Sequence, residues 1–148
     1  MPDKNTIRRA QEDKRAGKSA STQAGEFVRE EMHHIREGKH GARSTKQAIA
    51  IGLSKARRAG VPLPPPEPGT ASPETRESAV RALKEGRHGP HVPSPRRSRA
   101  VEGALRREGH AAATPEALAE QARSAARRRG PAARSAAAKK AARTRAKD

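Results

Sequence analysis

Large apolar residues recur at helical spacing most densely between residues 21 and 60. The first apolar stripe, on one face of a predicted helix, consists of Ala24, Val28, Met32 and Ile35, with Phe27 beside it. Ser21 or Thr22 can cap the start of this helix, and Gly38 supplies a left-handed stop after Glu37.

A second apolar stripe follows a short loop. Ser44 to Gln47 have the form of a capping box, in which the Gln47 side chain reaches back to the Ser44 amide. The helix that they open runs to about Ala59, so two antiparallel helices would bury their stripes together as an αα-hairpin over residues 21–60. The same apolar residues form the candidate face for a protein partner or for self-association: Phe27, Val28, Met32, Ile35, Ile49, Ile51 and Leu53.

Proline and glycine divide the rest of the chain. Residues 61–71 hold five prolines, which predicts a stiff, extended linker that serves as a spacer rather than as a docking segment. Ser-Pro or Thr-Pro pairs open three further predicted helices with thin apolar stripes, over residues 72–86, 94–109 and 114–130.

An imperfect repeat links the two halves of this layout. The heptapeptide Ile35–Gly41 matches Leu83–Gly89 position by position, which predicts a degenerate second hairpin over residues 72–109. We interpret the glycines of both turns as helix stops, and we treat Lys39 and Arg87 as auxiliary phosphate contacts.

Composition limits how much of this can pack. Of the hydrophobic residues, 30 are Ala and only 15 are Leu, Ile, Val or Phe, well below the roughly 20% expected of a globular chain. Residues 1–20 and the Ala/Lys/Arg-rich residues 131–148 lack anything to bury and are expected to be disordered. The fold class predicted is therefore all-α, with short helical hairpins joined by a Pro-rich linker and substantial disorder at both termini.

Net charge indicates the function of the chain more strongly than any motif does. The net charge is +17, and residues 121–148 hold ten Lys and Arg against one acid. A basic tail on a milder body is typical of proteins that bind nucleic-acid phosphates. Ser94–Arg97 also has the form of histone-tail units that favour a narrow minor groove, although a helix start explains the Ser and the Pro. The candidate nucleic-acid-binding residues are Lys39, Arg87, Arg96, Arg97, Arg127, Arg128, Arg129, Arg134, Lys139, Lys140, Arg143, Arg145 and Lys147.

Residues 24–60 resemble a bacterial family of small basic proteins of unknown function. The resemblance rests on Met32-His33-His34, on the turn Glu37-Gly38-Lys39, and on a helix of the form KQAIAIALSEA at Lys46 to Ala56. It implies the hairpin and carries no site. The tail is similar in composition to those of linker histones and bacterial histone-like proteins, through Ala136 to Ala142.

Several classes of function are not expected. The chain has no Cys, no signal peptide and no apolar run longer than Ala48 to Leu53, so we expect a cytoplasmic protein without a membrane partner. His33 and His34 point to different sides of a helix and His40 lies past its end, so we expect no metal site. No catalytic residues, cofactor or enzymatic activity are expected, because no nucleophile or phosphate-loop motif is present.

The sequence thus predicts a non-enzymatic, nucleoid-associated accessory protein that binds DNA phosphates with low sequence specificity. An RNA- or ribosome-associated protein is an alternative, because phosphates are common to both nucleic acids and stacking aromatics are absent. A protein-interaction module that uses the apolar face of the 21–60 hairpin is the other.

Overall fold

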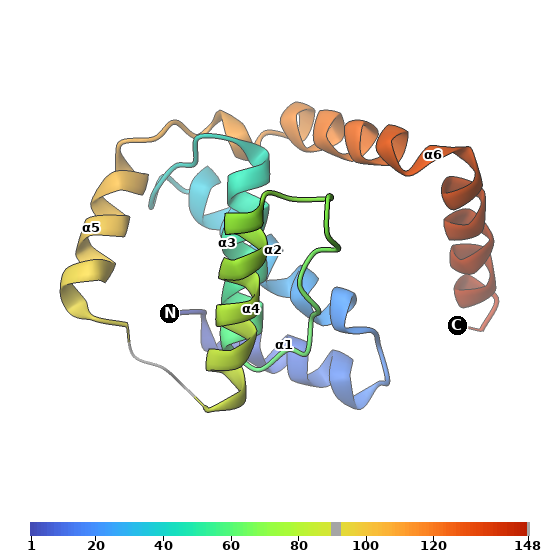
Figure 1. The fold of residues 1–148 in the computed structure, drawn as a ribbon, viewed down its shortest axis with the longest axis horizontal. Coiled ribbons are helices and arrows are strands. Elements are labelled where there is room, and N and C mark those ends of the chain that lie inside the picture. Colours follow the sequence, from blue (N-terminus) through green and yellow to red (C-terminus); the bar gives the residue numbers. More distant parts are fainter. Residues whose placement is uncertain (90–92, 148) are drawn as a thin grey trace. The chain divides into compact units, whose positions relative to one another are not determined.

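A computed structural model describes residues 1–89 and 93–147, and within these ranges every regular element is helical (Figure 1). The all-α prediction is therefore confirmed. Contacts divide the chain into two compact units, residues 1–113 and 114–148. The elements are α1 (Lys4–Arg15), α2 (Ala20–Arg36), α3 (Thr45–Arg58), α4 (Pro73–Arg87), α5 (Pro95–Arg106), the short 3-10 helix η1 (Ala111–Ala113) and α6 (Pro115–Arg145).

The centre of the first unit is the packed pair α2 and α3. Phe27, Met32 and Ile35 are buried, whereas Val28 and the three large residues predicted on α3 (Ile49, Ile51 and Leu53) are only half-buried. Small residues hold the crossing instead: a Cβ atom on Gly52 would lie 2.7 Å from the Val28 Cα atom. The two helix backbones thus approach more closely than large side chains would allow.

Residues 1–20, expected to be disordered, instead contain helix α1, which packs against α2. Ala10 is buried with Phe27 in one apolar cluster, and Ile7 is half-buried against it. Thr6 is 2% exposed, and the Arg9 guanidinium pairs with Glu26 on α2. The expectation was wrong because it considered this segment alone. Helix α1 cannot form a core by itself, but its few apolar residues pack against Phe27 and complete the cluster there.

The proline-rich segment, residues 61–71, is likewise part of the packed unit rather than a free spacer. Val61 is buried and Leu63 packs beside it against the Phe27 cluster. The buried Arg57 side chain on α3 donates hydrogen bonds to the carbonyl oxygens of Leu63 at 3.1 Å and Pro64 at 2.9 Å. The segment lacks regular structure, so its backbone oxygens are free to satisfy this buried cation.

Helix α4 packs on α3, and the hairpin predicted over residues 72–109 does not form in the part of the chain that is described. Ala79 and Ala82 are buried at the α3–α4 contact. Gly86 does not stop α4, which runs on to Arg87; a Cβ there would lie 1.9 Å from the Arg57 carbonyl oxygen. The repeated glycine therefore serves close approach in one copy and, at Gly38 with φ 73°, chain reversal in the other.

Helix α5 buries no residue, but the chain that follows it returns to the loop between α2 and α3. The amides of Gly41 and Ala42 donate to the carbonyl oxygens of Leu105 and Gly109, at 2.8 and 3.0 Å. Ala112 and Ala113 in η1 are buried, and the Arg36 side chain donates to the Ala113 carbonyl at 2.7 Å.

Two helix starts differ in detail from those predicted. Helix α2 begins earlier, because the Ser19 hydroxyl accepts a hydrogen bond from the Thr22 amide at 3.3 Å. At the start of α3 the Ser44 hydroxyl accepts from the Gln47 amide, while the Gln47 side chain accepts from the Arg43 amide rather than from Ser44.

The second unit is helix α6, in which two helical stretches meet at Gly130, with φ 78° (Figure 1). Residues 131–145, expected to be disordered, are helical although α6 buries no residue. High intrinsic helix propensity explains this, because Ala, Lys and Arg supply most of the segment. Among the described residues, no helix is both long and apolar enough to cross a membrane.

Candidate functional site

The second stretch of α6 carries positive charge without compensation. Residues 131–147 contain six Lys and Arg and no acid, and all six cations are exposed. At 3.6 residues per turn, Lys139, Lys140 and Arg143 share an arc of about 100°, while Arg134 and Arg145 lie opposite. Alanines fill most other positions, so this face can approach a polyanion closely.

The first stretch of α6 is partly neutralised. Glu120 forms exposed ion pairs with Arg123 at 3.3 Å and with Arg127 at 3.2 Å. Arg128 and Arg129 are exposed, with no acidic partner among the described residues. Positive charge thus increases along α6 toward its C-terminal end.

Four candidate cations lie in the first unit rather than in α6. Lys39 is paired with Glu37 at 3.0 Å; this hydrogen bond raises the pKa of Lys39 and lowers that of Glu37. Arg87 is exposed in the last turn of α4. Arg96 and Arg97 are exposed in the first turn of α5, where the helix dipole is positive and repels cations in the free protein.

The Gly38–Gly41 turn is not a phosphate cradle. The Gly38 and Lys39 amides donate to α2 carbonyl oxygens, the Gly41 amide donates to the last turn of α5, and the Ala42 amide donates to the chain after α5. A nest that binds an anion needs free amides that point to one spot, so this turn has a structural role.

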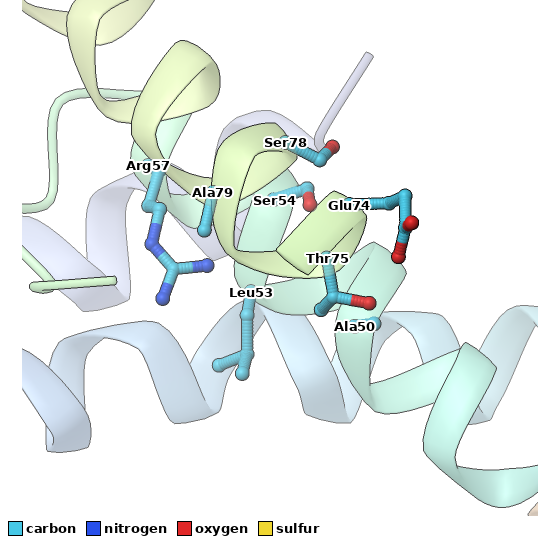
Figure 2. A pocket seen from close by; sticks show the side chains of 8 residues that line it. All are labelled: Ala50, Leu53, Ser54, Arg57, Glu74, Thr75, Ser78 and Ala79. Atoms are coloured by element: carbon cyan, nitrogen blue, oxygen red, sulfur yellow. The ribbon is translucent and has the colours of Figure 1, made fainter. Parts of the chain in front are cut away.

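The predicted partner face is covered largely by the chain itself. Phe27 faces α1 and the proline-rich segment, and Met32 and Ile35 are buried. Between α3 and α4 lies a depression of about 310 Å³, which Figure 2 shows with Leu53 and Arg57 from α3 near Ala79 from α4. Arg57 already donates to two backbone carbonyl oxygens, and the other polar lining residues are Ser54, Glu74, Thr75 and Ser78.

A buried cluster of carboxylates and histidines forms where α1 and the α2–α3 loop meet α2. Glu30 is 4% exposed and Glu31 is fully buried, and His34 follows one turn later. One ligand atom from each of Glu31, His34 and His40 lies within 4.8 Å of the other two, and the same holds for Asp3, Glu30 and His34. The absence of a metal site, expected from the sequence, therefore needs a direct test.

Sequence reasoning passed over this cluster although part of its signal was present. Glu30 and Glu31 precede His34 by four and three residues, a spacing that places side chains on one helix face. The position of His40 could not be read in the same way, because it depends on how the chain turns back after Gly38.

Fold and charge together define a small, basic, all-helical protein built on the α2–α3 pair. Residues 13–67 match the model of a family of unknown function (DUF6496). The matched segment includes α2, α3, Glu31, His34 and His40, and excludes Asp3 and α6. No curated protein and no solved structure matches the chain.

Proposed function

We propose that this chain is a non-enzymatic nucleic-acid-binding protein, associated with DNA, that contacts phosphates through the second stretch of α6. The observation that carries the proposal is the uncompensated charge of residues 131–147, presented on a helix that buries no residue. Packing does not explain the presence of a helix that makes no core contact. A bound polyanion would stabilise this helix by neutralising the repulsion among its cations.

Helical geometry limits how many phosphates can be contacted at once. One face offers Lys139, Lys140 and Arg143, with Lys147 just beyond the end of the helix. Each neutralised phosphate contributes a slope of about −0.9 to log affinity against log salt for duplex DNA. About four contacts therefore correspond to a slope contribution of about −3.6.

The mode of contact also predicts low sequence specificity. Long cations separated by alanines reach phosphate oxygens but present no fixed pair of donors toward a base edge. Any duplex of mixed sequence should bind with similar affinity. RNA is the alternative partner, because its phosphates have the same charge.

The test compares the full chain with a version that ends at Gly130, by salt titration of binding to one mixed-sequence DNA duplex. We expect the truncation to reduce the steepness of the salt dependence by three to four units, from about four lost phosphate contacts. An unchanged slope would show that the residues after Gly130 make no phosphate contacts. A duplex RNA of equal length is the parallel arm: tighter binding to RNA at the same salt would reassign the partner.

A further inference from the structure

The cluster of Glu30, Glu31, His34 and His40 contains two buried carboxylate oxygens without a hydrogen-bond donor, one of which faces His40 Nε2. Glu30 Oε2 and Glu31 Oε1 are buried, and neither accepts a hydrogen bond from any described residue. A buried, unpaired carboxylate oxygen is costly, and such atoms usually face a donor or a cation. We propose that Glu31, His34 and His40 bind a divalent metal ion of the zinc class.

The distance between two of the donors already suits such an ion. Glu31 Oε1 lies 3.3 Å from His40 Nε2. Zinc bonds of about 2.0–2.2 Å in tetrahedral geometry separate two ligand atoms by roughly 3.3–3.5 Å. One ligand atom of His34 lies within 4.8 Å of one from Glu31 and one from His40, and an ion bound by all three would draw these atoms closer together.

Neighbouring hydrogen-bonding groups orient the side chains of His40 and Glu31. His40 Nδ1 lies 3.0 Å from the Gly41 carbonyl oxygen. Because a carbonyl only accepts, Nδ1 must be the donor, and in the neutral ring Nε2 presents its lone pair to Glu31. Lys55 Nζ donates to Glu31 Oε2 at 2.7 Å, which leaves Oε1 directed at the site. Ligand residues fixed in this way by neighbouring hydrogen bonds are typical of metal centres.

Two lone-pair atoms at 3.3 Å repel each other unless a cation lies between them. That cation is either a proton on His40 or a metal ion. A proton on His40 would make an ion pair with Glu31 alone, and His34 would then pair with Asp3 and Glu30, whose carboxylate oxygens lie 3.6 and 3.7 Å from its Nε2. A metal ion uses all three donors, which is why we favour it.

The donor set selects the class of ion. Two imidazoles with carboxylate suit Zn²⁺, Co²⁺, Ni²⁺ or Fe²⁺, whereas Mg²⁺ and Ca²⁺ prefer oxygen alone. Glu30 Oε2 is a further buried oxygen beside His34, whose Nε2 lies 3.7 Å from Glu30 Oε1. The ion would tie α2 to the loop that hydrogen-bonds to Leu105 and Gly109, and so would stabilise the first unit.

The test is titration of the tag-free full chain with Zn²⁺ by calorimetry, repeated with Co²⁺ by visible absorption. We expect one ion per chain and at least a 100-fold loss of affinity in His40→Gln. The matched control is His33→Gln, the neighbouring exposed histidine of α2, which should bind within about twofold of the native chain.

Folding of each variant is checked by thermal melting, with and without Zn²⁺. The melting temperature of the native chain and of His33→Gln should rise with Zn²⁺ and return on chelation, while that of His40→Gln should not move. Absence of saturable one-to-one binding would overturn the proposal in favour of a protonated ion pair. Equal losses in His33→Gln and His40→Gln would also overturn it, since binding would then be adventitious binding by surface histidines.

Discussion

Two glycines in helices offer a prediction in which the same substitution has opposite effects. Gly25 in α2 has no atom within 4 Å of an added Cβ, whereas a Cβ on Gly52 in α3 would lie 2.7 Å from the Val28 Cα atom. Gly25→Ala should therefore stabilise the fold by about 0.5–1 kcal/mol, through the lower conformational entropy of the unfolded chain.

Gly52→Ala has the same entropic gain, so the difference between the two variants isolates the cost of the contact. Overpacking against a backbone that cannot rotate away costs about 1–3 kcal/mol. In a domain of this size each kcal/mol changes the melting temperature by about 4 °C or more. Gly25→Ala should thus melt at least about 4 °C above Gly52→Ala.

The assay is thermal unfolding of the three full-length chains, followed by circular dichroism at one protein concentration. Equal melting temperatures for the two variants would mean that α2 and α3 do not approach closely at Gly52. The α2–α3 packing that the proposed metal site requires would then be incorrect.

Two further predictions concern helices α1 and α4 of the first unit. Ile7→Asp should destabilise the fold by about 1–2 kcal/mol by placing a charge against the Phe27 cluster. Gln11→Asp, on the exposed face of α1, should not destabilise it. Equal melting temperatures for the two variants would show that α1 does not pack against the cluster. Glu74 has a lowered pKa, chiefly through a hydrogen bond from its own amide and another with Ser72. A group with a depressed pKa adds stability above its unfolded pKa and loses it as pH falls through the folded pKa. Glu74→Gln should therefore be less stable than the native chain at neutral pH, and the gap in urea midpoints should close as the pH falls below the ordinary glutamate value of 4.5. A gap that widens with acid would contradict this assignment.

Local signals in the sequence located several elements well. Ser72 and Thr114 precede Pro at the first helical position, and both cap their helices through the side-chain hydroxyl. Such signals act within one turn and do not depend on the rest of the fold. Composition likewise located the basic segment, because charge is counted without knowing any contact, although that segment was expected to be disordered and is helical up to Arg145.

What could not be predicted depends on contacts between distant residues. Helix α1 has too few apolar residues to be recognised alone, and it folds against Phe27 because α2 supplies the missing surface. Gly86 resembled a helix stop by analogy with Gly38, yet its role is set by the Arg57 carbonyl oxygen of another helix. His40 joins Glu31 for the same kind of reason, since only the path of the loop brings the two together.

The claim that one face of α6 contacts phosphates is tested most directly by a matched pair of charge variants. Lys139→Gln/Arg143→Gln removes two cations from the predicted face, and Arg134→Gln/Arg145→Gln removes two from the opposite face. In salt titrations on the same mixed-sequence DNA duplex, the first variant should flatten the slope by about 1.8 units and the second by much less. Equal reductions would contradict binding through one helical face, and no reduction in either would contradict the proposed function itself.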